Sequence, residues 1–237
     1  MSFDQGPARP RSNRILSAAP REEYERLFPR LEYAELRCGD VLHEAGEPLS
    51  HIYFPYSGTI SVVVQMRDGD QAEAGIVGRE GMLGLPLVLG TDTAPLRALA
   101  QVPGGAMRMR AADFAEEVGR RAGLYRLLLR YAQSFFVQTA VTAACNRLHP
   151  MEARLPKWLL MTRDRAESDD LGLTHEFVAT MLGVRRAGVT GALGLLRSEG
   201  LIDHSRGRIR ILDAEGLGRA SCECYGVVKE EYDRLVV

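Results

Sequence analysis

Residues 173–197 read LTHEFVATMLGVRRAGVTGALGLLR, and this stretch predicts two short helices joined by a tight turn. Thr174 can cap the first helix, because its hydroxyl oxygen can accept from the free N–H groups of the opening turn. Gly183 falls where the turn needs a positive φ, and Ala179 is small where the second helix must cross closely. The apolar residues at helical spacing are Val178, Met181, Leu182, Val189, Ala192, Leu193 and Leu196. Together these features predict a helix-turn-helix, with two ordinary antiparallel helices as the alternative.

The residues that follow predict a β-hairpin. Residues 202–211 read IDHSRGRIRI and alternate apolar and charged residues about a glycine-containing turn. Ile209 and Ile211 should point inward, and Arg208 and Arg210 outward, because strand side chains alternate faces. A basic hairpin directly after a helix-turn-helix is typical of the wing of a DNA-binding domain. An ordinary solvated hairpin is the alternative.

Length and charge limit the kind of protein. The chain has 237 residues, which is enough for two modest domains. It has no run of about eighteen apolar residues to span a bilayer, and its N-terminus lacks the apolar core of a signal peptide. We therefore expect a cytoplasmic protein without a membrane partner. The formal net charge is −1, so affinity for phosphate must come from a local basic face. The arginines that can form this face are Arg185, Arg186, Arg197, Arg206, Arg208 and Arg210.

Four cysteines are spread over the chain: Cys38, Cys145, Cys222 and Cys224. Structural disulfides are not expected in a cytosolic protein. The Cys222-Glu-Cys224 segment is too short for a CxxC pair, and no second pair stands at zinc-finger spacing. An iron–sulfur cluster needs four thiolates, usually close together in sequence. We therefore expect no metal and no other cofactor.

The first half of the chain, residues 13–119, predicts an antiparallel β domain. A short amphipathic helix over residues 13–30 comes first, and residues 67–70 (RDGD) are a hairpin-turn signal. The predicted strands are Glu32–Leu36, Val41–His43, His51–Phe54, Thr59–Met66, Gln71–Val77, Leu96–Gln101 and Ala106–Met109. Short strands with regular turns suit a jelly roll, and with the helices that follow the fold class is α+β.

A long helix is predicted over residues 120–149, and His149-Pro150 ends it. Its apolar residues cover more than one stripe, so one face can pack on the β domain while another pairs with a second copy. Burial of the whole helix within one chain is the alternative. The residues expected at the dimer interface are Leu124, Leu128, Tyr131, Phe135 and Cys145. Residues 150–213 then form the winged helix-turn-helix domain, and residues 214–237 form a helical tail whose packing the sequence leaves open.

With this order of elements, the chain resembles the Crp/Fnr superfamily of bacterial regulators, which includes the catabolite activator protein, from about residue 13 to residue 213. The matching segments are GDV (39–41), AGE (45–47), IYF (52–54), GTISV (58–62) and the helix-turn-helix run 174–196. The resemblance implies a homodimer, paired through the long helix, that binds a two-fold symmetric site on double-stranded DNA. It also implies contact with RNA polymerase and a response to a small-molecule effector in the β domain.

The candidate effector pocket departs from the family pattern. In members that bind cyclic nucleotides, a glycine-flanked glutamate holds the ribose, and a later Arg-Ser or Arg-Thr pair holds the phosphate. The corresponding residues here are Gly81, Met82, Leu83, Gly84 and Arg97. Met82 replaces the carboxylate, and Ala98 follows Arg97 where a hydroxyl is expected. A buried phosphate without a matched cation is costly, so we do not expect tight binding of cyclic AMP.

The second helix of the helix-turn-helix also departs from the family pattern. Arg186 matches the first arginine of the family motif, but Ala187 stands for a glutamate and Gly191 for a second arginine. We expect base recognition to depend on Arg186, because arginine paired with guanine is the commonest specific contact. The candidate DNA-binding residues are Thr174, His175, Arg185, Arg186 and Thr190, with Arg206 and Arg208 as phosphate contacts.

The alternative function is that of a cupin-like enzyme or a metal- or ligand-binding jelly roll whose helical domain contacts protein. Such metal sites need several histidines and a carboxylate inside the barrel, and the β half offers only His43 and His51. The same two histidines are the candidates for a haem ligand. No Ser/His/Asp or Cys/His constellation stands out and there is no Walker-type loop, so we do not expect an enzyme and assign no catalytic residue.

Overall fold

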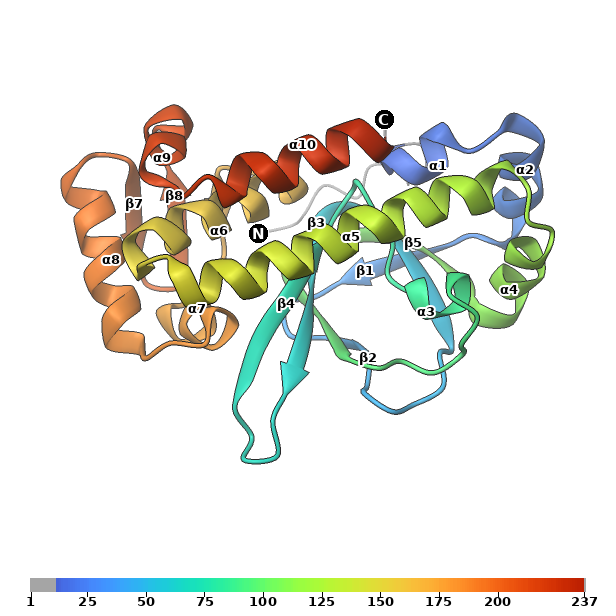
Figure 1. The fold of residues 1–237 in the computed structure, drawn as a ribbon, viewed down its shortest axis with the longest axis horizontal. Helices are drawn as coiled ribbons and strands as arrows, with labels where there is room; N and C mark the ends of the chain where they lie inside the picture. The colour runs from blue at the N-terminus through green and yellow to red at the C-terminus, as the bar shows by residue number, and fades with distance from the viewer. Residues whose placement is uncertain (1–11, 237) are drawn as a thin grey trace.

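The computed structural model describes residues 12–236 (Figure 1). The expectation that the chain lacks a signal peptide rests on the N-terminal residues, and residues 1–11 lie outside this range. An N-terminal β domain and a C-terminal winged helix-turn-helix are joined by a long helix, α5 (Gly123–Leu148), which extends along much of the molecule. None of the helices in the described range is both long and apolar enough to cross a membrane.

The β domain is built on a five-stranded antiparallel sheet. Its strands are β1 (Glu32–Leu36), β2 (Val41–His43), β3 (His51–Gln65), β4 (Gln71–Val77) and β5 (Arg97–Arg110). The order is β1-β5-β3-β4, and β2 also pairs with β5. The β3–β4 hairpin turns at Gly69, which has a φ of +95°, as its RDGD sequence predicts. The predicted antiparallel β domain is therefore confirmed.

The two central strands are longer than the sequence predicts. The sequence predicts separate strands over residues 51–54 and 59–66, but both segments belong mainly to β3. The two strands predicted between residues 96 and 109 are likewise joined in β5. The register between β3 and β5 shifts near Gly58. A Cβ at Gly58, whose φ is +72°, would lie 2.5 Å from the carbonyl oxygen of Val102. These bulges bend the strands and break their alternating pattern, which makes each strand look like two.

The helices of the β domain are short. The helix expected over residues 13–30 is divided, because Pro20 disfavours helix in the residue before it and starts a new one. Asn13 caps the first helix by accepting from the N–H of Leu16 at 3.2 Å. The elements are α1 (Arg14–Ala18), α2 (Arg21–Leu27), the 3-10 turn η2 (Phe28–Arg30), α3 (Leu85–Val88) and α4 (Ala111–Gly119).

The C-terminal part contains the predicted helix-turn-helix and wing. Its helices are α6 (Met151–Ala166), α7 (His175–Leu182), α8 (Arg186–Ser198), α9 (Ala214–Ala220) and α10 (Cys224–Val236). A small sheet has the order β6-β8-β7, with β6 (Asp170–Leu171), β7 (Ile202–Ser205) and β8 (Arg208–Ile211). The tail helix α10 lies alongside α5 and also contacts α6 (Figure 1), which answers the packing question that the sequence left open.

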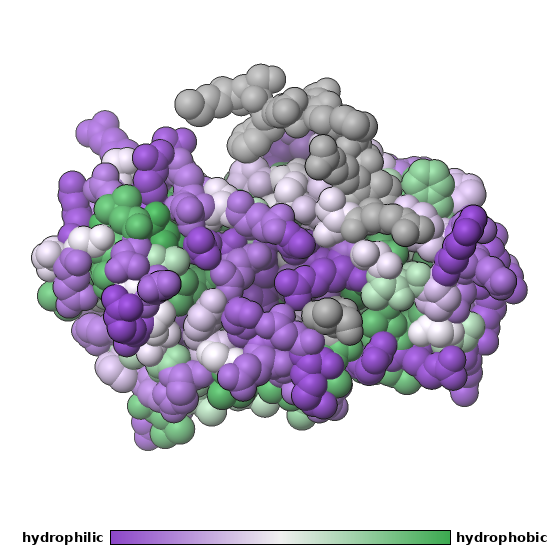
Figure 2. All heavy atoms as spheres, turned by 90° about the horizontal axis from the view of Figure 1, so that it is seen from above, coloured by the Kyte–Doolittle hydropathy of each residue, from purple (hydrophilic) through white to green (hydrophobic). Residues whose placement is uncertain are grey.

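Both parts of the chain share one apolar core. It continues from the β domain through α5 and α6 into α7 and α8. The surface seen from above, on the side of α10, is largely hydrophilic with small separate apolar patches (Figure 2). Because the apolar core is continuous, the winged helix-turn-helix is packed against the β domain and α5 in this structure.

Candidate DNA-binding interface and sensor cavity

The helix-turn-helix is held by the local features that its sequence contains. Thr174 caps α7 and accepts from the N–H of Phe177 at 3.1 Å. Gly183 ends α7 with φ +62° and ψ +42°, which is the left-handed conformation that a tight turn requires. The predicted inner faces are buried: Val178, Ala179, Met181 and Leu182 on α7, and Val189, Ala192, Leu193 and Leu196 on α8.

The outer face of α8 combines cations with bare backbone. Arg185 is the N-cap residue, without a capping hydrogen bond from its side chain, and Arg186 and Thr190 are exposed on the first two turns of α8. Gly188 and Gly191 have open space where a Cβ would be, so another molecule can approach the helix backbone closely. The Arg186 guanidinium is 3.9 Å from the Glu176 carboxylate, and both side chains are about 70% exposed. Such a pair is weak in water, so Arg186 can turn to another partner.

His175 and Thr190 position each other between α7 and α8. His175 Nδ1 lies 3.1 Å from the Thr190 hydroxyl, and the His175 ring packs edge-on against His204 at 5.2 Å. Burial, followed by the charges of His204 and Arg186, lowers the pKa of His175. These surroundings therefore favour the neutral form of the ring. The predicted contact residue Thr174 differs from these two, because its hydroxyl is already engaged in capping α7.

The wing presents one arginine at its tip and two along its edge. Arg206 is exposed in the β7–β8 turn and makes no ion pair with any described residue, while Gly207 supplies the positive φ of +69°. Arg208 and Arg210 both approach the Asp170 carboxylate on β6, at 3.0 and 3.5 Å. Asp170 partly neutralises both arginines. This pairing could not be predicted from the sequence, because β6 lies far from β8 along the chain.

A cavity of about 300 Å³ lies between the sheet, the α3 loop and α5. Among its described lining residues, His43 is the single titratable side chain, and burial lowers the pKa of His43. Its apolar lining includes Val62, Val77, Met82, Leu83, Leu96, Phe135 and Phe136. The cavity is therefore suited to an uncharged apolar molecule, with a volume at the lower end of ligand sites.

The residues predicted for the effector pocket separate into two groups. Met82, Leu83 and Gly84 line the cavity. Gly81 instead packs under the ring of Tyr131, where a Cβ would come within 2.3 Å of the ring. Arg97 is absent from the described lining and pairs with Glu44 at 3.3 Å. The cavity consequently lacks the cation that the predicted pocket would have supplied.

The prediction for the dimer surface of α5 needs correction. Leu124, Leu128, Tyr131 and Cys145 are at most 2% exposed, so they are already buried within one chain and cannot face a partner. Phe135, the fifth residue, is half-buried and lines the cavity. The exposed face of α5 instead carries Leu129 and Phe136, which are 40% and 68% exposed, together with Ala140 and Ala143. The sequence showed that α5 has several apolar stripes but not which stripe the β domain covers.

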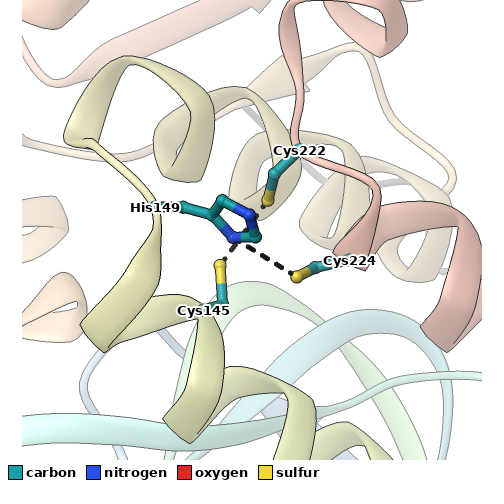
Figure 3. Close-up of side chains that lie close together, drawn as sticks. All are labelled: Cys145, His149, Cys222 and Cys224. Atoms are coloured by element: carbon teal, nitrogen blue, oxygen red, sulfur yellow. Dashed lines mark hydrogen bonds between the residues drawn. The ribbon is translucent and has the colours of Figure 1, made fainter.

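Three of the four cysteines, although far apart in the sequence, lie close together in the structure. Cys145, Cys222 and Cys224 meet at the end of α5, beside His149 (Figure 3). Burial raises the pKa of Cys222 and raises that of Cys224 to about 12. For Cys145 burial opposes ionisation, but a hydrogen bond with His149 and the charge of Lys157 outweigh it and lower the pKa. Only Cys38 stands apart and exposed.

A buried polar junction connects the β domain with α6, and the sequence did not predict it. Glu73 on β4 accepts from the Trp158 indole N–H at 2.8 Å, and its other oxygen lies 2.6 Å from the Ser61 hydroxyl. Ser61 also lies 2.9 Å from Gln101 Oε1. One hydroxyl hydrogen cannot serve both acceptors at once, so Ser61 donates either to Glu73 or to Gln101. Burial, the main cause, raises the pKa of Glu73 to about 7.

A second part of the junction involves α5 and α10. Arg165 on α6 pairs with Glu80 at 2.8 Å, and both side chains are buried. Arg165 also donates to Gln138 on α5 at 3.1 Å, and Gln138 donates to the Tyr232 hydroxyl on α10 at 3.2 Å. These contacts connect the β domain, α5, α6 and α10. Removing either partner of the Arg165–Glu80 pair would leave the other charge buried and unpaired.

Two family models match separate parts of the chain. The model of the cyclic nucleotide-binding domain matches residues 33–121, and the model of the Crp-like helix-turn-helix domain matches residues 153–220. No curated protein matches the chain in sequence.

Solved structures share the fold at low sequence identity. FixK2 from Bradyrhizobium japonicum has a TM-score of 0.68 and 15% identity, over 81% of this chain and 98% of that chain. TTHB099, a CRP-family transcriptional regulator from Thermus thermophilus, has a TM-score of 0.62 and 20% identity, over 79% and 96%. The c-di-GMP responsive global regulator CLP of Xanthomonas campestris has a TM-score of 0.62 and 14% identity, over 81% and 99%.

A cyclic nucleotide-binding type of β domain joined to a Crp-like helix-turn-helix defines a DNA-binding transcription regulator. The chain belongs to the Crp/Fnr superfamily of transcriptional regulators.

Proposed function

We propose that the chain acts as a homodimer that places two α8 helices in successive major grooves of a two-fold symmetric DNA site. The observation that carries the proposal is the outer face of α8, where Arg185, Arg186 and Thr190 are exposed beside open glycine backbone. A recognition helix of this kind contacts base edges with its N-terminal residues. Arg206 at the wing tip is in a position to contact the phosphate backbone.

The dimer would form through the exposed face of α5. Leu129, Phe136 and Ala143 are exposed and seven residues apart, and Ala140 lies between the last two on the same side. A seven-residue repeat brings side chains onto one seam between two helices. An exposed phenylalanine in such a seam is well placed to be buried by the same residue of a second copy.

The effector would be an uncharged, mainly apolar molecule. The cavity under α5 has an apolar lining, and Arg97 is engaged with Glu44. A cyclic nucleotide would bury its phosphate there without a cation, which is costly. Calorimetric titration should therefore detect no binding of cyclic AMP. The neutral fluorophore N-phenyl-1-naphthylamine should bind instead. Leu96→Trp, which fills the cavity, should weaken the binding of this fluorophore. Micromolar affinity for cyclic AMP would contradict this part of the proposal.

The proposal places no catalytic step in the chain. His43 is the single titratable group among the described residues that line the cavity, and its Nε2 is 2.8 Å from the carbonyl oxygen of His51. No carboxylate or thiol stands beside it among those residues, and the Thr139 hydroxyl there already donates to the carbonyl oxygen of Phe135. We expect the dimer to act by binding DNA and contacting RNA polymerase.

Selection of the full chain on a random duplex pool tests the proposal. At about 0.15 M salt non-specific binding is weakened, and a symmetric site with half-sites about one helical turn apart should emerge. The control is Arg186→Ala, which should select the site more weakly and with one base position relaxed. If no site emerges with or without cell extract as a source of effector, the proposal fails.

A further inference from the structure

Four side chains with metal-binding atoms meet where α5 ends and α10 begins. Cys145 lies in the last turn of α5, His149 is its C-cap, and Cys222 and Cys224 flank the start of α10 (Figure 3). Their sulfur and nitrogen atoms all lie within 4.8 Å of one another. The sulfurs of Cys145 and Cys222 are 3.5 Å apart, and the Cys224 sulfur is 3.6 Å from Nδ1 of His149.

The two shortest of these distances match the edges of the tetrahedron that surrounds a zinc ion. With Zn–S bonds of about 2.3 Å and a Zn–N bond of about 2.0–2.1 Å, ligand atoms around zinc lie about 3.5–3.8 Å apart. A cluster of several irons would hold its thiolates farther apart, because more than one metal stands between them. We propose that Cys145, His149, Cys222 and Cys224 bind a single zinc ion. Four protein ligands leave no open position, so the site is structural and not catalytic.

The local structure explains how residues distant in sequence supply one site. Cys145 and His149 are four residues apart, which puts them on the same side of the helix end. The Cys222 N–H donates to the carbonyl oxygen of Ala153 at 3.2 Å, and this bond fixes the loop before α10 against α6. Val141 and Ala153 pack on the three cysteines and shield them from water.

The surroundings of the four ligands also suit a metal. His149 Nε2 lies 3.4 Å from the Glu223 carboxylate. When Nε2–H donates to this carboxylate, the lone pair of Nδ1 faces the sulfurs, and this outer partner is typical of a zinc-bound histidine. Three thiolates with zinc leave one net negative charge, and the buried Lys157 lies close enough to act on Cys145 electrostatically.

The zinc ion would fix the tail helix to the junction between α5 and α6, where the two parts of the chain meet. It would join the end of α5 to the start of α10, directly before Pro150 and α6. Farther along, α10 is held against α5 by the Gln138–Tyr232 hydrogen bond of 3.2 Å. Removing zinc should therefore loosen the N-terminal end of α10 first.

Metal analysis of the full-length chain tests this site. The chain, purified under reducing conditions without added metal, should contain one zinc ion per chain when its metal content is measured by elemental mass spectrometry. Cys224→Ser and His149→Ala should lose the zinc, His149→Cys should keep it as a four-cysteine site, and Cys38→Ser is the matched control that keeps it. Loss of zinc in Cys38→Ser, or its retention in Cys224→Ser, would show that other ligands hold the metal.

A cobalt titration of the wild-type chain keeps the test independent of how the variants fold. After zinc removal and reduction, one equivalent of Co²⁺ should give the visible bands of tetrahedral cobalt with thiolate charge-transfer bands, and zinc should abolish them. Absence of these bands, or isolation of the chain with iron and acid-labile sulfide, would overturn the proposal. Neither measurement uses DNA, so its outcome is separate from that of the proposed regulator function.

Discussion

Replacing Glu73 by glutamine should remove a pH-dependent contribution to stability from the junction between the β domain and α6. Burial, the largest cause, raises the pKa of Glu73 from 4.5 to about 7. Hydrogen bonds from Ser61 and Trp158, and the charges of Lys157 and Arg165, oppose this rise. Glutamine should imitate the protonated carboxyl, because its carbonyl can accept from Trp158 and its amide can donate to Ser61.

The sign and size of the effect follow from the two pKa values. A folded-state pKa above the unfolded one means that the folded chain holds the proton more tightly. The stabilisation is complete below about pH 4.5 and is lost as the pH rises through about 7. Between about pH 5 and about pH 8, wild-type stability should fall by about 2.5 kcal/mol through this group.

Urea unfolding followed by tryptophan fluorescence measures this effect. Trp158 is the single tryptophan and donates directly to Glu73, so the signal comes from the junction itself. The free energy of unfolding of Glu73→Gln, minus that of wild type, should rise by about 2.5 kcal/mol over this pH range. Glu230→Gln, an exposed carboxylate on α10, is the control and should follow wild type. A difference between Glu73→Gln and wild type that stays constant with pH would refute the reasoning.

Three further predictions concern binding and assembly. Arg186→Ala should cost about 1–3 kcal/mol on the selected DNA site and relax one base position in competitive binding, whereas an equal loss on random duplex would assign it to phosphate alone. Arg206→Ala should reduce the salt slope of binding by about one, and Arg208→Ala should reduce it less because its guanidinium is already paired; identical slopes would contradict this. Phe136→Glu should give monomers in analytical ultracentrifugation, because two carboxylates would meet across the seam. The control is Phe28→Glu, which also changes an exposed phenylalanine and should leave the dimer intact. A dimeric Phe136→Glu would place the interface elsewhere.

The helix-turn-helix could be predicted because its determinants are local. The cap at Thr174, the left-handed turn at Gly183 and the apolar spacing of α7 and α8 all act within about two dozen residues. The same holds for the wing, where the alternation of Ile209 and Ile211 with arginines matches the buried and exposed positions of β8. Where local preference and tertiary packing agree, the sequence is sufficient.

The parts that sequence could not predict depend on residues far apart in the chain. The sulfurs of Cys145 and Cys222 meet across 77 positions, and nothing in their spacing indicates that α10 returns to the end of α5. A usable signal was the pair Cys145 and His149, four residues apart at the end of the predicted long helix. On α5 the apolar stripes are equivalent in sequence, and only packing shows that the β domain covers Tyr131 and leaves Phe136 exposed.

Helix α5 lines the cavity, carries the exposed seam, and contacts both α6 and α10. Phe135 and Thr139 border the cavity, Phe136 is on the exposed seam, and Gln138 contacts both Arg165 on α6 and Tyr232 on α10. A ligand can shift the position of the DNA-binding helices only by binding one arrangement of α5 more tightly than another. Because the cavity and the seam adjoin on consecutive residues, a rotation of α5 that alters one must alter the other. The polar junction at Gln138 then ties the same rotation to α6, whose far end carries the helix-turn-helix.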